Sequence, residues 1–323
     1  MNKAARLPVF ERGLGRLKLA MKSTITNMGR PVGGVVGERF KWDDDYLNDT
    51  WVKTKQVHSL ASLGYRHSPS SQVKLEQIAA VSEVHGLFTP ECVQALQTIC
   101  TNLESHAGNS DWIISRRTRG VTALSPFVSD MMNSRRFLLA MSRIAGLPLL
   151  PYPMLTPRSQ VNYFYPAGEQ EKQAQLGMWH TDGTNFVLNI LLTAQDNYTG
   201  GEFLYHEGAI DTFNRESPQA DRVREAGLPQ PGDALYIYGS RLFHGVMPVR
   251  TGRRMSLVLS FHCPHSIKDS NRFWHLASDD GIPLTVKNWG RLQRALNQSV
   301  AEQYAQLGLE PITFEELYGD MQP

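Results

Sequence analysis

The sequence predicts a mainly β protein with flanking helices, whose core is an antiparallel sandwich or barrel and is compatible with a jelly roll. A stretch of about 105 residues holds seven or more short runs rich in β-forming residues, which turn signals separate and no helix-length spacer interrupts. Helical periodicity appears only on either side of this stretch. Together these two observations favour a β core supported by helices.

The chain has 323 residues, 41% of them hydrophobic, so it can bury a sizeable core and is longer than a usual single domain. Changes in pattern predict one compact unit of four regions. These are an irregular N-terminal extension at 1–75, a helical support region at 76–150, the β core at 151–265 and a helical tail at 266–323.

The charge balance indicates a small-molecule partner. Net charge is +2, from 33 basic and 31 acidic residues, so no global field attracts nucleic acid or an anionic membrane. No apolar run reaches the length of a membrane span. The sequence leaves open whether the chain acts alone or as a homodimer.

The three cysteines, Cys92, Cys100 and Cys263, favour a reducing compartment. The first two fall in one expected helix, roughly 12 Å apart, which is too far for a disulfide. Reduced thiols and a cytoplasmic location are the default expectation. The first 30 residues carry seven basic residues against Glu11 alone. We prefer a basic arm that packs on the body or on a partner subunit over an organelle transit peptide.

Helix boundaries are marked by caps and prolines. Thr89 is the expected N-cap of a helix whose first residue is a proline, and Ser125 followed by Pro126 opens a second helical segment that ends at Gly146. The tail contains the helical sequence TVKNWGRLQRALNQSVAEQYAQLG. We expect the first two helices to support the β core.

A histidine and an aspartate, His180 and Asp182, stand two residues apart ahead of an apolar run. Residues i and i+2 of a strand face the same way, so this spacing directs an imidazole and a carboxylate into one small volume. Taken alone, such a pair is more often a chance surface pair in a turn. A metal site therefore needs a third ligand.

His244 is the best third ligand among the ten histidines of the chain. It follows a turn, a strand and a second turn, which places it at the mouth of the expected sheet. Two histidines and one carboxylate form the facial triad that binds iron(II) with open coordination positions. A structural zinc site would need four protein ligands, and no CxxC motif or fourth ligand accompanies these three.

Arg254 and Ser256 follow ten and twelve residues after His244. In a strand they share one face, while Met255 and Leu257 share the other, so a guanidinium and a hydroxyl enter the barrel together. A buried arginine needs an anion, and Asp182 is already committed to the metal. The expected partner is a carboxylate of a ligand, which a guanidinium binds with two hydrogen bonds.

This combination resembles the iron(II)- and 2-oxoglutarate-dependent dioxygenases, a family whose core is a double-stranded β-helix, or jelly roll. The likeness covers roughly residues 158–263 and rests on HxD, the distal His244, and RxS ten residues further on. It also includes a TGGEF turn at residues 199–203, as in members close to prolyl hydroxylases. Each motif is weak alone, but their order and spacing make the resemblance specific.

The resemblance implies a role for each matching residue. His180, Asp182 and His244 would bind Fe²⁺ and form the catalytic centre, and Arg254 and Ser256 would bind the distal carboxylate of the co-substrate 2-oxoglutarate. The reaction would consume O2, release succinate and carbon dioxide, and usually hydroxylate the substrate. Halogenating relatives have a small residue in place of the aspartate, so the presence of Asp182 favours oxygen transfer. Desaturation, cyclisation and epoxidation stay open.

The strand before the HxD motif usually lends a side chain to the co-substrate in this family. An alignment on Pro166 puts Tyr163 and Tyr165 on the inner face, and an alignment on Asn162 puts Asn162 and Phe164 there. We favour the tyrosines as co-substrate-binding residues. Packing of these aromatic rings in the core is an equally good alternative.

Two other functions are compatible with a jelly roll: a cupin-like metalloenzyme that does not use 2-oxoglutarate, and a non-catalytic binding protein. The first would not need Arg254 and would usually have more histidines at its metal. The leading hypothesis remains an oxygenase acting on a small amino-acid-derived or natural-product substrate. The basic cluster at Arg116, Arg117 and Arg119 is either an anion-binding site or, as we prefer, a solvated loop.

Overall fold

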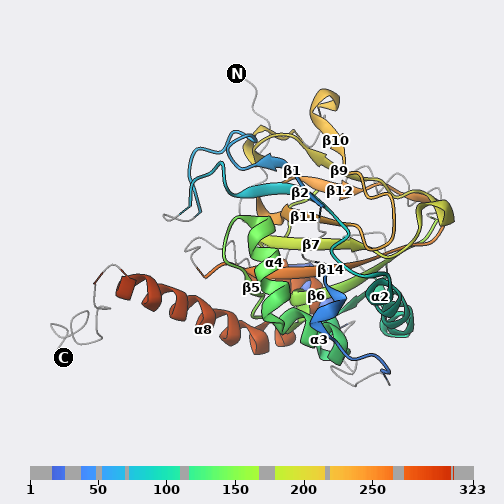
Figure 1. Cartoon of the computed structure of the whole chain (residues 1–323). Helices are drawn as coiled ribbons and strands as arrows, with labels where there is room; N and C mark the ends of the chain where they lie inside the picture. Colours follow the sequence, from blue (N-terminus) through green and yellow to red (C-terminus); the bar gives the residue numbers. More distant parts are fainter. Residues whose placement is uncertain are drawn as a thin grey trace.

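The computed structural model describes residues 17–25, 38–48, 53–69, 73–109, 116–166, 179–214, 219–264, 273–306 and 308. Its largest element is a nine-stranded sheet, which runs across the molecule in Figure 1 in the order β1-β2-β11-β7-β14-β6-β4-β3, with β5 paired to β14. The strands are β1 (Lys53–Ser59), β2 (Ala79–His85), β3 (Gly108–Asn109), β4 (Arg116–Arg119), β5 (Leu150–Pro151), β6 (Ser159–Phe164), β7 (Phe186–Leu191), β11 (Ala234–Tyr238) and β14 (Arg254–His262).

Two smaller sheets complete the β structure. One has the order β10-β9-β12 and the other pairs β13 with β8. Their strands are β8 (Tyr198–Gly200), β9 (Phe203–His206), β10 (Val223–Glu225), β12 (His244–Val246) and β13 (Val249–Gly252). All the pairings are antiparallel, which is the arrangement expected for a sandwich. The protein is therefore mainly β, with several helices around the sheets.

Three helices, α2 (Pro90–Asn102), α3 (Pro126–Asn133) and α4 (Arg135–Ala145), lie against one face of the large sheet (Figure 1). Thr89 caps α2 by accepting a hydrogen bond from the Cys92 amide, as the sequence predicted. The second predicted helix is two helices. Ser134 ends α3 and its hydroxyl caps α4 by accepting a hydrogen bond from the Phe137 amide, which breaks the segment without a proline or glycine.

The alternation along β14 separates the core from the site. Met255, Leu257, Leu259 and Phe261 are all buried, and the Phe261 ring lies 6.1 Å from that of Phe137 on α4. The intervening residues begin with Arg254 and Ser256 and face the other side of the sheet. We call these the helix-covered face and the inner face.

The first 150 residues contribute more β structure than the sequence suggests. The region expected to be an irregular extension contains β1, and the region expected to be helical contains β2, β3, β4 and β5 as well as three helices. β1 is an exposed edge strand of polar composition, and β2 is buried on both faces, so neither shows the alternation that identifies a strand. Of the basic arm expected at residues 1–30, residues 1–16 and 26–30 lie outside the described residues, and residues 17–25 are helical.

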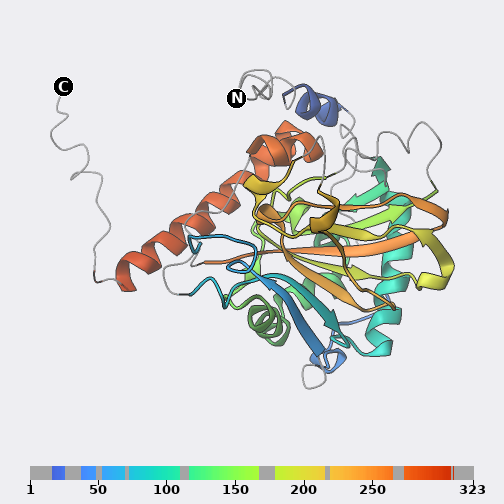
Figure 2. The same ribbon diagram turned by 90° about the horizontal axis from the view of Figure 1, so that it is seen from above.

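The tail forms α7 (Phe273–Asp280) and α8 (Ile282–Gln306), and α8 runs away from the body of the molecule (Figures 1 and 2). A short helix, α5, spans Leu155–Arg158. The described 3-10 turns are η1 (Asp44–Tyr46), η2 (Leu103–His106), η3 (Val121–Ala123), η4 (Gln195–Asn197), η5 (Ile210–Thr212), η6 (Ala220–Arg222) and η7 (Gly239–Arg241). Among the described helices, none is both long and apolar enough to cross a membrane.

Candidate active site

The three residues of the expected triad come together at one end of the sheets. His180 and His244 form an isolated antiparallel bridge, in which each backbone amide donates to the carbonyl of the other at 3.0 Å. The Asp182 amide donates to the Gly239 carbonyl at 2.9 Å, which fixes the carboxylate beside both imidazoles. One ligand atom from each of these three side chains lies within 4.8 Å of the other two.

The ring nitrogens point at the carboxylate. Nε2 of His180 lies 3.7 Å from Oδ1 of Asp182, and Nε2 of His244 lies 3.5 Å from Oδ2. Nδ1 of His244 lies 3.0 Å from the Leu242 carbonyl, which can only accept. A proton on Nδ1 therefore leaves Nε2 with a lone pair for a metal, the tautomer that metal-binding histidines adopt.

His244 is the most buried member of the triad, at 4% exposure. Burial by itself lowers the pKa of this imidazole, but the negative charge and hydrogen bond of Asp182 and the Leu242 carbonyl outweigh burial, so the pKa is raised. The ring of Phe203 stacks on that of His244 at 5.3 Å with an interplanar angle of 12°. The imidazole is thus held on three sides.

Arg254 is 2% exposed and has no acidic partner within 4.0 Å among the described residues. Its Nη1 donates to the Ser256 hydroxyl at 3.4 Å, its guanidinium lies 5.2 Å from the centre of the Phe164 ring, and its Nε has no hydrogen-bond partner. Burial lowers its pKa, an effect that Tyr198 partly offsets. An incompletely paired, buried guanidinium is what a carboxylate ligand requires.

A cavity of about 270 Å³ opens onto this guanidinium. Its lining includes Tyr198, Phe203 and the turn that joins β8 to β9. Gly201 in that turn has φ +72°, and a Cβ there would lie 2.9 Å from Cδ of Arg254. Gly201 thus allows the turn to pass close to the arginine, while a Cβ on Gly200 would collide with the Pro248 carbonyl. Phe203, at the end of the motif, stacks on His244.

The prediction that Tyr163 and Tyr165 face the co-substrate is wrong. Tyr163 pairs with Met255, so it lies on the helix-covered face, where its hydroxyl donates to the Cys100 carbonyl at 2.6 Å. Tyr165 is 39% exposed and hydrogen-bonds to Glu104. Asn162 and Phe164, the alternative pair, lie opposite Ser256 and Arg254 on the inner face.

Arg117 and Arg119 do not form a solvated loop. They lie on β4 opposite Asn162 and Gln160, and they pair with Asp279 and Asp280 of α7. Both arginine side chains are largely buried, at 8% and 15% exposure. They attach α7 to the inner-face side of the sheet and are already neutralised by carboxylates of the chain.

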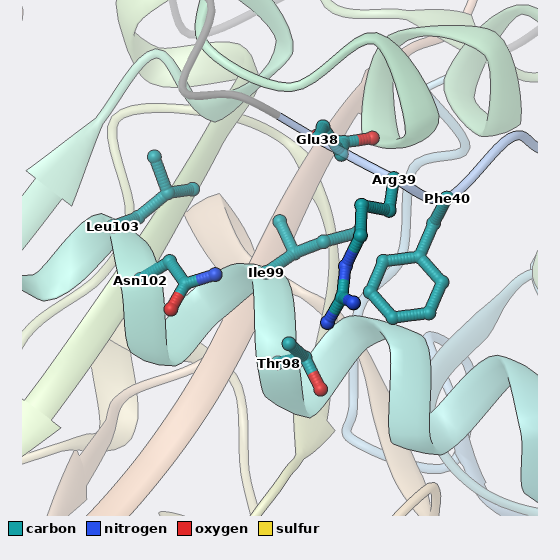
Figure 3. Close-up of a pocket in the computed structure, with 7 residues that line it drawn as sticks. All are labelled: Glu38, Arg39, Phe40, Thr98, Ile99, Asn102 and Leu103. Atoms are coloured by element: carbon teal, nitrogen blue, oxygen red, sulfur yellow. The ribbon is translucent and has the colours of Figure 1, made fainter.

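A second pocket, between residues 38–40 and α2, is not part of this site. Figure 3 shows Glu38, Arg39 and Phe40 facing Thr98, Ile99 and neighbouring residues of the helix. Its volume is about 40 Å³, which is far below that of a small-molecule site. None of the triad residues lines it.

Two contacts of the site were not predicted from the sequence. The stacking of Phe203 on His244 was signalled only by its place in the TGGEF motif. Gly239 had no signal, yet a Cβ there would lie 2.8 Å and 2.9 Å from Cβ and Cγ of Asp182 and would also collide with Oδ2. This glycine leaves the space that the Asp182 carboxylate occupies beside the two imidazoles.

No protein-family model matches the chain, and no curated protein is similar to it at a significant level. Solved structures to which it is similar include an oxidoreductase of the 2OG-Fe(II) oxygenase family from Burkholderia pseudomallei, with 19% identity and a TM-score of 0.30. That match covers 42% of the chain and 55% of the oxidoreductase, so the chain spans only about half of that protein's length.

Two further similar structures contain a metal. HygX from Streptomyces hygroscopicus was solved with nickel, 2-oxoglutarate and hygromycin B; it is 15% identical, with a TM-score of 0.42 and coverage of 57% and 83% of the two chains. EctD from S. alaskensis, solved with bound Fe, is 13% identical, with a TM-score of 0.40 and coverage of 69% and 89%. Because the identities and TM-scores are low, we base the functional proposal on the side chains of the site.

Proposed function

We propose that the protein is an iron(II)- and 2-oxoglutarate-dependent oxygenase with a double-stranded β-helix core, which hydroxylates a small molecule and releases succinate and carbon dioxide. One observation carries the proposal: within the part of the chain that the structure describes, a His-Asp-His cluster and a buried arginine with no acidic partner lie in one β framework. His180, Asp182 and His244 are the proposed ligands of Fe²⁺. Arg254 and Ser256 are the proposed binding residues for the distal carboxylate of 2-oxoglutarate.

The donor set fits iron(II) better than a structural metal. Two imidazoles and one carboxylate bind iron facially and leave positions for a chelating co-substrate and for O2. The bound iron would supply the oxidation chemistry. The protein would orient the co-substrate through Arg254 and keep the Nε2 atom of His244 unprotonated through the Leu242 carbonyl.

The proposed substrate is an amino-acid-derived or other natural-product molecule. The near-zero net charge and the lack of a recognisable nucleic-acid or peptide motif support this substrate class. A cytoplasmic location is supported by the low cysteine content of the chain, three residues whose thiols are all buried. A homodimer is compatible with the structure but is not required for the site.

The test is an anaerobic titration of the purified protein with Fe²⁺ and then 2-oxoglutarate. We expect a weak charge-transfer absorption band in the visible region, and slow release of succinate when air is admitted. A double variant, His180→Ala with Asp182→Ala, should show neither, whereas His106→Ala, in an exposed histidine of the described chain, should behave as wild type. Metal binding that survives the double variant would place the metal site elsewhere.

The cupin-like alternative makes a different prediction from the same titration. It expects metal binding that the double variant removes, with no absorption change on adding 2-oxoglutarate and no succinate under air. A non-catalytic binding protein would show no specific Fe²⁺ binding at all. The three results are mutually exclusive.

A further inference from the structure

Four rings lie on the side of the strand ends that faces away from the triad. We call them the Phe213 cluster, and its members are Trp179, His206, Phe213 and Phe243. The ring of Phe213 lies 4.3 Å from that of Phe243, stacked at 23°. It lies 5.2 Å from Trp179 and 5.3 Å from His206. Phe213 therefore touches every other member of the cluster.

Two members of the cluster are direct chain neighbours of metal ligands. Trp179 precedes His180, and Phe243 precedes His244. Since consecutive residues of an extended segment face opposite sides, both rings point away from the triad when the imidazoles point towards it. Tyr205 pairs directly with His244, so these two side chains face the same side. His206 comes next after Tyr205 and therefore also points away from the triad.

The segment that carries Phe213 is anchored independently of the triad. The Ile210 amide donates to the Tyr65 hydroxyl at 3.1 Å, and that hydroxyl donates to the Arg241 carbonyl at 2.6 Å. Thr212 adds a contact of 2.9 Å between its hydroxyl and Nε2 of His206, which is 1% exposed. The anchored segment thus presents the Phe213 ring as a fixed support.

We propose that Phe213 is a positioning residue for the metal centre, whose ring holds Trp179 and Phe243 together and so fixes the spacing of His180 and His244. Within the described residues, an isolated bridge joins the backbones of the two ligands, and their rings lie 4.4 Å apart, so aromatic rings packed behind them add to what fixes their spacing. Residues that orient metal ligands typically change metal affinity by tenfold or more when they are removed. This inference rests on the proposed function, because it assumes that the triad binds a divalent metal.

The experiment is a titration of the full-length protein with Co²⁺, followed by its visible absorption, which reports both affinity and ligand geometry. We expect Phe213→Ala to weaken Co²⁺ binding about tenfold and to alter the absorption bands, and Phe213→Tyr to stay within about twofold of wild type. If Phe213→Ala does not fold, Phe213→Leu, which keeps the apolar volume without an aromatic ring, gives the same comparison with a smaller loss.

The matched control is Phe40→Ala. Phe40 is also a half-buried aromatic residue in a ring cluster, 6.5 Å from Phe127, but it has no contact with the triad segments. We expect it to lower thermal stability and leave Co²⁺ affinity within about twofold. Co²⁺ affinity equal to that of the wild type in folded Phe213→Ala or Phe213→Leu, or an equal loss of affinity in Phe40→Ala, would overturn the inference. Failure of the wild type to bind Co²⁺ would instead reject the proposed function.

Discussion

At the scale of single residues, the most informative side chain is Arg254. Two other arginines with largely buried side chains, Arg117 and Arg119, each have a carboxylate partner at 2.6 Å. Arg254 is more buried than either, and its nearest polar side-chain partners are the hydroxyls of Ser256 and Tyr198. Keeping a guanidinium in such a place costs free energy unless an anion binds there.

Replacing this arginine should therefore weaken co-substrate binding. We expect Arg254→Ala to lower the affinity for 2-oxoglutarate about tenfold to a hundredfold, because charge-assisted hydrogen bonds contribute about 1.5–3 kcal/mol. The measurement is the 2-oxoglutarate dependence of the charge-transfer band with Fe²⁺ present. Arg253→Ala is the matched control, since Arg253 is the neighbouring residue and pairs with Glu104 at 2.6 Å. Unchanged affinity in Arg254→Ala would contradict the role given to this residue.

Gly239, which has no side chain, is equally important for the proposed metal ligands. At Gly239, an added Cβ would overlap the Asp182 side chain and push the carboxylate away from the two imidazoles. We expect Gly239→Ala to weaken Co²⁺ binding at least tenfold. The control is Gly290→Ala in α8, where nothing lies within 4 Å of the added Cβ, so Co²⁺ affinity should not change. Similar affinities for the two variants would show that Asp182 can move without loss.

At the scale of elements, the two strands that flank the site were not equally predictable. The alternation of β14 between Arg254 and Ser256 on one side and apolar residues on the other is clear in the sequence, and the structure has it. In β6 nearly every residue is buried, so apolar side chains do not mark one face. The sequence allowed two alignments of β6, and only the pairing with β14 distinguishes them.

The residues of the candidate site also differ in how well the sequence predicts them. The clustering of His180, Asp182 and His244 and the burial of Arg254 were predicted from residue type and spacing, because the proposed chemistry restricts both. The contacts that hold them, from Phe203, Gly239 and Phe213, depend on how distant segments pack. Gly239 and Phe213 stand in no local pattern, so one sequence could not indicate their contacts, and the stacking of Phe203 was signalled only by its place in the TGGEF motif.

The face assignment of β6 can be tested directly. Tyr163→Phe removes a buried hydroxyl that donates to the Cys100 carbonyl on α2. We expect it to lower the free energy of unfolding by about 1 kcal/mol, measured by chemical denaturation, and to leave 2-oxoglutarate affinity unchanged. Asn162→Ala, one position earlier and on the inner face, should instead reduce that affinity or the succinate yield. If Tyr163→Phe instead lowered the 2-oxoglutarate affinity and Asn162→Ala did not, Tyr163 would be the residue that binds the co-substrate.

At the scale of the whole molecule, the C-terminal helices are attached to the β core by an ion-pair network. Asp280 of α7 is 2% exposed and receives two hydrogen bonds from Arg119, at 2.6 Å from Nε and 3.0 Å from Nη2. It also accepts one from Thr156 at 2.8 Å. The negative charges of Asp280 and Asp279 outweigh the effect of burial and raise the pKa of Arg119. This network joins segments about 160 residues apart in the chain.

Removal of one partner should therefore affect the entire fold. We expect Asp280→Ala to lower the free energy of unfolding by about 3 kcal/mol, since it leaves a largely buried guanidinium with a single, more distant carboxylate, Asp279 at 3.5 Å. Thermal or urea unfolding measures the change. The control is Asp45→Ala, which removes a pair with Arg136 at 3.4 Å whose aspartate is 95% exposed, and it should have no measurable effect. If both variants unfold like the wild type, the network does not stabilise the attachment of α7 and the tail folds independently of the β core.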